Sequence, residues 1–168
     1  PDNVIPYSQE IRMYYPNGRL KEQENRLWSS TRQKYLGVTR QHYDFDGRGN
    51  IIDFSISYRN ELSDEWYAGY RVRQYFDVRN NMTEYYEYKS PNPGSEPELT
   101  RKQFSYYNQD NNLLEFTDSV KNSENGSFYC SELQQYQYDI LGRETATLVS
   151  KYLTAGTYTV DFNASKLA

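Results

Sequence analysis

Short segments of alternating apolar and polar residues are separated by turn residues along the whole chain, and the pattern recurs every 31 residues. One position of this repeat is aromatic in every copy: Tyr14, Phe45, Phe76, Tyr107 and Tyr138. Because aromatic residues make up 17% of the chain, the chance that any one position of the repeat is aromatic in all five copies is roughly one in ten thousand. The pattern therefore predicts five copies of one structural unit.

Turn residues follow the aromatic position in each copy. Four positions later the chain has only Gly or Asn, the residue types that most easily adopt positive φ: Gly18, Gly49, Asn80, Asn111 and Gly142. Four of the turns open with Asp or Asn, whose side chain can accept a hydrogen bond from the backbone two residues on: Asp46, Asp77, Asn108 and Asp139. This is the signature of a type I turn closed by a left-handed residue, so each copy is predicted to be a β-hairpin.

Two strands per copy give about ten strands. Those leading into the turns are expected at Ile11–Tyr15, Tyr35–Phe45, Trp66–Phe76, Leu99–Tyr107 and Phe128–Tyr138, and those leaving them at Leu20–Leu27, Ile51–Tyr58, Met82–Tyr88, Leu113–Val120 and Thr145–Lys151. Longer, less similar connections join the hairpins at Ser29–Lys34, Asn60–Asp64, Ser90–Glu98, Asn122–Ser127 and Thr154–Gly156. We expect an all-β fold: an antiparallel meander of five 31-residue hairpin repeats, forming an open twisted sheet or a partial barrel.

The domain organisation follows from the repeat. Residues 1–9 show no clear period and are expected to form an extended lead-in, and residues 10–168 a single β-hairpin-repeat domain. Tyr, Phe and Trp, at 19, 7 and 2 residues, carry most of the apolar surface, whereas the mean hydropathy of −1.02 reflects scarce aliphatic residues. A thin core is therefore predicted.

Charge and hydropathy argue against two classes of partner. A net charge of −4, with no concentrated basic stripe, argues against nucleic acid. No run of about 18 apolar residues occurs, so we expect a protein that does not span a membrane.

Residues suited to catalysis are scarce. His42 is the single histidine and precedes a turn, and Cys130 is the single cysteine, so no disulfide within the chain is predicted. No metalloprotease, Cys-x-x-Cys, dinucleotide-binding or phosphate-loop motif is present, and we expect no enzyme, no cofactor and no metal site. Two alternatives stay open: a pair of carboxylates acting as a glycosidase among 23 Asp and Glu, and a weak oxygen-rich calcium loop at Asp44, Asp46, Gly47 and Asn50.

An excess of aromatic residues marks the third repeat: Trp66, Tyr67, Tyr70, Tyr85, Tyr86 and Tyr88. Because successive strand residues point to opposite faces, Tyr85 and Tyr86 are not expected in one core, and at least one face should present Tyr to solvent. Exposed rings can stack on sugars or on a protein partner, so these six residues form the predicted ligand-binding site. The competing interpretation is that both faces are covered, or that Tyr serves as a soluble strand former.

Two segments resemble known bacterial families. Tyr138-Asp139-x-x-Gly142-Arg143 resembles the Tyr-Asp hairpin repeats of Rhs-type cell-surface proteins. The segment from Tyr138 to Val149, together with Ala155 to Ser165, resembles the C-terminal sorting domain of proteins exported by the type IX (Por) secretion system. The chain also resembles uncharacterised secreted β-repeat proteins of gut bacteria. These resemblances imply a bacterial protein of the periplasm, the cell surface or the extracellular space, and since the sequence begins Pro1-Asp2-Asn3 we expect that a signal peptide has been removed.

The predicted function is a non-enzymatic secreted or cell-envelope β-repeat protein that acts as a protein-interaction or structural module. The alternative is a carbohydrate-binding module that uses exposed Tyr and Trp, and a third class is an acid-base hydrolase on the sheet. The expected partners are an envelope protein or a glycan, with oligomers formed through the sheet edges.

Overall fold

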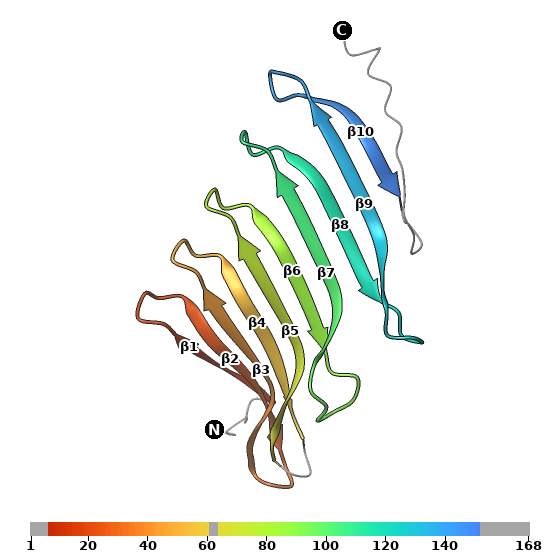
Figure 1. The fold of residues 1–168 in the computed structure, drawn as a ribbon. Helices are drawn as coiled ribbons and strands as arrows, with labels where there is room; N and C mark the ends of the chain where they lie inside the picture. Colours follow the sequence, from red (N-terminus) through yellow and green to blue (C-terminus); the bar gives the residue numbers. More distant parts are fainter. Residues whose placement is uncertain (1–6, 61–63, 152–168) are drawn as a thin grey trace. The chain divides into compact units, whose positions relative to one another are not determined.

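The computed structural model describes residues 7–60 and 64–151, and these consist of strands and turns (Figure 1). The strands are β1 (Ser8–Tyr14), β2 (Leu20–Ser29), β3 (Lys34–Phe45), β4 (Ile51–Arg59), β5 (Trp66–Phe76), β6 (Met82–Lys89), β7 (Glu98–Tyr107), β8 (Leu113–Lys121), β9 (Phe128–Tyr138) and β10 (Glu144–Lys151). The largest difference from the predicted bounds is at the start of β1, which begins at Ser8 rather than Ile11.

The sheet has ten strands, and each is hydrogen-bonded to the strands next to it in sequence. Their order is β1 to β10 without a crossover. The predicted all-β antiparallel meander is confirmed, and of the two forms expected it is the open sheet.

The five turns adopt the predicted geometry. The backbone is left-handed at each expected position, with φ of +82° at Gly18, +101° at Gly49, +75° at Asn80, +66° at Asn111 and +74° at Gly142. The amide of each of these residues donates to the carbonyl of the first turn residue at 2.9 to 3.2 Å. The amide of that first residue in turn donates to the carbonyl just after the turn at 2.8 to 3.0 Å. The turn chemistry therefore fixes the same hairpin geometry five times.

Asp46 shows how a turn carboxylate stabilises this backbone. Its Oδ1 accepts hydrogen bonds from the amides of Arg48, Gly49 and Asn50 at 2.7 to 2.9 Å, and its Oδ2 accepts one from Asn50 Nδ2 at 2.9 Å. The hydrogen bond from the Asn50 side chain, followed by those from the backbone, lowers the pKa of Asp46 from 3.8 to about 2. The same arrangement recurs at Asp77 and Asp139, whose pKa values are also lowered.

The described chain divides into two compact units. Unit 1 contains the described residues up to Arg73, which include β1 to β4 and most of β5, and also Tyr88–Glu98. Unit 2 contains Gln74–Glu87, which includes most of β6, and the described residues from Leu99 onward. The expectation of one domain over residues 10–168 stays a prediction.

The interior is thin, as the composition predicts. Among residues 7–60 and 64–147, Val72 is the one buried hydrophobic side chain, at 8% exposure. The other buried residues are Gly37 and three polar residues, Glu24, Ser105 and Asp118. Within each unit the strands form a single sheet, so lateral contacts between neighbouring strands supply the packing.

In unit 1 these lateral contacts are mainly aromatic. Tyr43 on β3 packs against Phe54 on β4 with ring centroids 5.0 Å apart, and Phe54 packs edge-on against Tyr70 on β5 at 6.3 Å. A ring also lies over a glycine: a Cβ at Gly69 would come within 2.2 Å of the Tyr58 ring. A glycine beneath an aromatic ring lets a single-layer sheet bury apolar area without a second layer.

The predicted aromatic column joins neighbouring hairpins partly through hydroxyl groups. Tyr107 donates to the carbonyl of Met82 at 3.4 Å, and Tyr138 donates to the carbonyl of Leu113 at 2.9 Å. In both cases the acceptor is the first residue of the outgoing strand of the preceding hairpin.

Several predicted features lie outside the described residues. They are residues 1–6 of the lead-in, residues 61–63 of the second long connection, the connection Thr154–Gly156, and the segment Ala155–Ser165 that resembles a sorting domain. Within the described part of the chain, no helix long and apolar enough to cross a membrane occurs.

Candidate functional site

The six aromatic residues predicted to bind a ligand are all half-buried. Trp66, Tyr67, Tyr70 and Tyr88 belong to unit 1, whereas Tyr85 and Tyr86 belong to unit 2. Tyr67 packs against Tyr58 with centroids 6.0 Å apart, and the Tyr85 hydroxyl donates to Glu87 at 3.3 Å. Neighbouring side chains therefore cover part of each ring, and the binding role of the six stays a prediction.

Trp66 illustrates how a ring in this sheet is covered. The guanidinium of Arg40 lies over the indole, 4.3 Å from its centroid, and the ring edge lies over Gly37, where a Cβ would be 2.7 Å away. Arg40 also donates to Glu24 at 2.9 Å. One face of the indole is thus occupied by a cation that is itself ion-paired.

A group of neighbouring rings in unit 2 includes two exposed tyrosines. Tyr75 on β5, Tyr86 on β6 and Phe104 on β7 form an edge-to-face series with centroid distances of 6.0 Å for both pairs. Tyr106, two residues after Phe104, shares its face of the sheet. Tyr75 is 48% and Tyr106 is 58% exposed. We call Tyr75, Tyr86, Phe104 and Tyr106 the aromatic strip.

Polar groups border the aromatic strip. Glu84 accepts a hydrogen bond from the Tyr86 hydroxyl at 2.6 Å, and Glu115, the cross-strand partner of Tyr106, accepts one from Gln135 at 2.8 Å. Tyr106 lines two hollows of about 270 and 550 Å³. The first also includes Glu84, and the second Glu115 and Gln135. Flat rings with carboxylate and amide groups beside them form an amphipathic surface.

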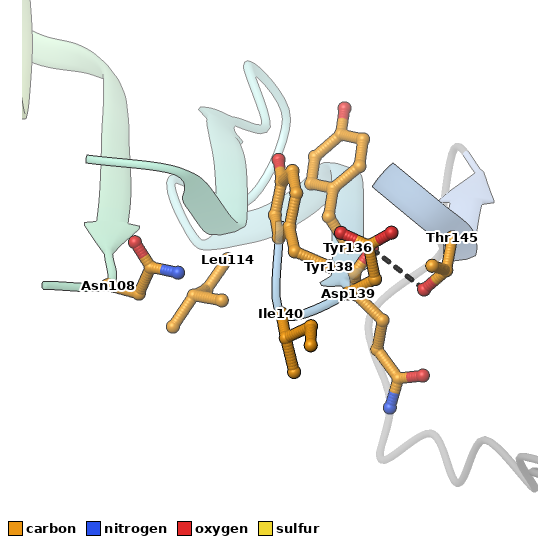
Figure 2. Close-up of a pocket in the computed structure, with 8 residues that line it drawn as sticks. Asn108, Leu114, Tyr136, Tyr138, Asp139, Ile140 and Thr145 are labelled. Carbon is orange, nitrogen blue, oxygen red and sulfur yellow. Dashed lines mark hydrogen bonds between the residues drawn. The ribbon is translucent and has the colours of Figure 1, made fainter. Parts of the chain in front are cut away.

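A further hollow of about 600 Å³ lies at the last described hairpin (Figure 2). It is lined by Asn108, Leu114, Tyr136, Gln137, Tyr138, Asp139, Ile140 and Thr145. Two of its polar side chains already have partners within the chain: Asp139 Oδ1 accepts the amides of Leu141 and Arg143, and the Thr145 hydroxyl donates to the carbonyl of Gln137 at 3.2 Å. These contacts stabilise the hairpin turn.

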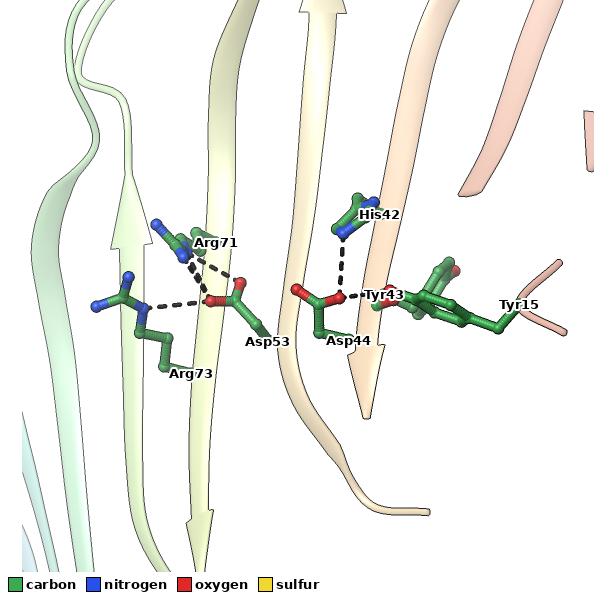
Figure 3. A network of polar contacts seen from close by, with 7 residues as sticks. All are labelled: Tyr15, His42, Tyr43, Asp44, Asp53, Arg71 and Arg73. Carbon is green, nitrogen blue, oxygen red and sulfur yellow. Dashed lines mark hydrogen bonds and ion pairs between the residues drawn. The ribbon is translucent and has the colours of Figure 1, made fainter. Parts of the chain in front are cut away.

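A network of charged side chains crosses strands β3, β4 and β5 of unit 1 (Figure 3). Asp53 accepts from Arg71 Nε at 2.9 Å and Nη2 at 2.5 Å, and from Arg73 Nε at 3.3 Å. Asp44, paired with Asp53 across the two strands, accepts from the Tyr15 hydroxyl and lies 3.4 Å from His42 Nε2. The Tyr15 hydrogen bond lowers the pKa of Asp44.

These contacts bear on the glycosidase alternative. Asp44 and Asp53 are a pair of carboxylates on one face of the sheet, as that chemistry requires. A general acid, however, needs a carboxyl group whose pKa is raised. The pKa of Asp44 is lowered, and Asp53 is held by two guanidinium groups. The pair is therefore better suited to joining strands than to transferring protons.

Asp118 is the most buried charged group, at 4% exposure. Burial by itself would raise its pKa, but hydrogen bonds from Arg101, at 2.8 and 3.0 Å, and from Ser131, at 2.7 Å, lower the pKa below its usual value. Burial raises the pKa of the Cys130 thiol, which donates to the carbonyl of Glu132. Across residues 7–60 and 64–151, no group of three or more His, Cys, Asp or Glu side chains is placed to hold a metal ion.

Two charged columns of the 31-residue repeat were missed by the sequence reasoning. Acidic residues recur at Glu22, Asp53, Glu84 and Glu115, and basic residues at Arg40, Arg71 and Lys102. The structure joins Glu22 to Arg40 at 3.3 Å and Asp53 to Arg71 at 2.5 Å. Aligning the charged positions in the same register as the aromatic ones would have revealed these ion pairs.

Comparisons with known proteins support the fold. No protein-family model matches the chain, and neither does any curated protein. Among solved structures, the chain is similar to a protein of unknown function from Bacteroides fragilis NCTC 9343, with a TM-score of 0.50 and 15% identity over 76% of this chain and 92% of that one.

Two DUF3836 family proteins show weaker likeness. One, from Bacteroides vulgatus ATCC 8482, has a TM-score of 0.44 and 14% identity over 56% of this chain and 91% of that one. The other, from Parabacteroides distasonis ATCC 8503, has a TM-score of 0.36 and 12% identity over 71% and 93%.

Proposed function

We propose that the chain is a non-enzymatic secreted or cell-envelope protein that acts as a protein-interaction module. The observation that carries this proposal is the thin sheet, in which Val72 is the single buried hydrophobic side chain among residues 7–60 and 64–147. Large side chains that a two-layer protein would enclose are instead available to a partner. The likeness of Tyr138–Arg143 to the repeats of Rhs-type cell-surface proteins supports the location in the envelope.

The aromatic strip is the contact surface we assign to this partner. Tyr75 and Tyr106 are about half exposed, and each offers a rigid ring that loses little conformational entropy on binding. Tyr side chains of this kind are enriched at the centres of protein interfaces. The neighbouring Glu84 and Glu115 would favour a partner with basic or hydrogen-bond-donating groups.

Binding of the purified chain to an envelope fraction of the source bacterium tests this proposal. Tyr106→Ala should weaken binding by about tenfold, since it removes the most exposed ring of the aromatic strip. The matched control is Tyr129→Ala. Tyr129 is exposed in the same unit, but it pairs with Val120, five residues along β8 from the Tyr106 partner Glu115, so it lies on the opposite face. Absence of binding, or equal loss with both variants, would contradict the proposal.

A second candidate function is carbohydrate binding by the same strip. The specific observation in its favour is that exposed rings lie beside the carboxylates of Glu84 and Glu115 and the amide of Gln135. Rings stack on the apolar faces of sugars, while carboxylates and amides bond their hydroxyl groups. For this second candidate we assign the sugar site to the aromatic strip rather than to the surface around Trp66.

Treatment of the envelope fraction separates the two candidates. Digestion of its proteins with a protease should abolish binding if the partner is a protein. If the partner is a glycan, binding should survive protease digestion and be competed by soluble polysaccharide, again with a loss in Tyr106→Ala and not in Tyr129→Ala.

A further inference from the structure

Strand β1 is an edge strand whose residues are exposed and whose backbone is regular. It pairs with β2 and has no other neighbouring strand in the part of the chain that the structure describes. Every β1 residue except the half-buried Ile11 is exposed. The strand contains no Pro and no Lys, and its regular register with β2 continues from Ser8 to Met13. It therefore lacks the proline, lysine or mid-strand bulge that commonly prevents an edge from pairing with another chain.

Two backbone hydrogen bonds establish which β1 groups point outward. The amide of Trp28 donates to the carbonyl of Tyr7 at 2.9 Å, and the amide of Tyr15 donates to the carbonyl of Arg19 at 2.8 Å. Because inward and outward groups alternate along a strand, the odd-numbered residues from Tyr7 to Tyr15 bond inward. The outward amides and carbonyls are those of Ser8, Glu10, Arg12 and Tyr14.

These four residues restrict how a second copy of β1 can pair antiparallel with the first. Hydrogen-bonded pairs must join an even-numbered residue of one copy to an even-numbered residue of the other. Three of the registers that satisfy this rule align the charged residues closely. One places Glu10 opposite Glu10 and another places Arg12 opposite Arg12, and like charges in direct opposition are destabilising. The register between these two places Glu10 opposite Arg12 twice, and Ile11 opposite Ile11 on the two-fold axis.

We propose that β1 is a homodimerisation strand, which pairs antiparallel with β1 of a second copy in the register Glu10 to Arg12. This register bonds all four outward residues and overlaps the whole strand, with Ser8 opposite Tyr14 at both ends. In the single chain, Arg12 Nε already lies 2.5 Å from Glu10 on the same face. Both side chains are more than a third exposed, so they can exchange this contact for the one across the interface. The inference is independent of the aromatic strip, which lies in unit 2.

Charge reversal tests the register. Sedimentation velocity should show a concentration-dependent dimer for the parent chain. Glu10→Arg and Arg12→Glu should each weaken dimerisation by roughly 10- to 30-fold, because each replaces two opposite-charge pairs by two like-charge pairs. The double variant restores both pairs and should recover the parent affinity within about threefold. A monomeric parent, a dimer insensitive to the single reversals, or a double variant as weak as the singles would overturn the proposal.

Cysteine crosslinking tests the axis directly. In a Cys130→Ser background, Ile11→Cys should form an interchain disulfide under mild oxidation. Position 11 of one copy lies opposite position 11 of the other in a non-hydrogen-bonded pair, so their two Cα atoms are about 4.5 Å apart. Gln9→Cys on the same strand face is the control, because the two introduced thiols would be offset by four residues, about 13 Å along the strands. Crosslinking through position 9 rather than 11, or through neither, would contradict the proposed register.

Discussion

Gly49→Ala should destabilise the second hairpin far more than the same change two residues earlier. Gly49 has a φ of +101°, and a left-handed backbone costs a residue with a Cβ about 1 to 2 kcal/mol. The new Cβ would also lie 2.4 Å from Arg19 Nη2. Arg19 must then move away from the Asp46 carbonyl, at 3.3 Å, and from the Phe45 ring, at 5.4 Å, which adds about 0.5 kcal/mol. We expect a total loss of about 2 kcal/mol in the free energy of unfolding.

Gly47→Ala is the matched control in the same turn. A Cβ at Gly47 meets nothing within 4 Å, and its φ is not in the left-handed region, so the change should be neutral or slightly stabilising. Urea unfolding followed by Tyr and Trp fluorescence measures the difference, and hydrogen exchange of the β3 and β4 amides locates it. Gly49→Asn should lose clearly less than Gly49→Ala, because Asn tolerates this backbone. Equal losses for Gly47→Ala and Gly49→Ala would refute the reasoning.

Three other perturbations follow from the same contacts. Asp118→Ala should lower the free energy of unfolding of unit 2 by about 2 kcal/mol in urea, since it leaves the half-exposed Arg101 without its buried acceptor. The lowered pKa of Asp46 means that the unfolded chain binds more protons between about pH 4 and pH 2, so stability should fall as the pH drops through that window. Asp46→Asn should lose this part of the pH dependence, as measured by unfolding at several pH values. Gly69→Ala should lower the free energy of unfolding by about 1 to 3 kcal/mol, because the Tyr58 ring would lie 2.2 Å from the new Cβ and must shift. An unchanged midpoint of thermal unfolding would contradict this packing of Tyr58 over Gly69.

Turn positions were predictable because their chemistry is local. Asn80 indicates a left-handed backbone because Asn tolerates that conformation, and Asp77 indicates a turn because its side chain accepts hydrogen bonds from residues no more than four positions away. Strand bounds followed, since the turns set where each strand begins and ends. The thin core was also predictable, because it depends on composition alone.

The exposure of individual rings was not predictable in this way. Alternation places Trp66 on one face of β5, but whether that face meets solvent depends on Arg40, a residue two strands away whose guanidinium lies over the indole. Conversely, Tyr75 and Tyr106 remain exposed, and which side chains lie beside them, such as Glu115 opposite Tyr106, depends on the cross-strand register. The expectation that the third repeat presents Tyr to solvent is met by Tyr75, which was not among the six predicted residues.

An NMR measurement of backbone geometry and cross-strand contacts tests the thin hairpin sheet most directly. Scalar couplings should give positive φ at Gly18, Gly49, Asn80, Asn111 and Gly142. Hα–Hα Overhauser contacts within each unit should join only strands that are successive in the chain, as in the pairings of β1 with β2 and β8 with β9. Negative φ at these five residues, or contacts that stack one strand pair over another within a unit, would contradict a single-layer sheet with two accessible faces.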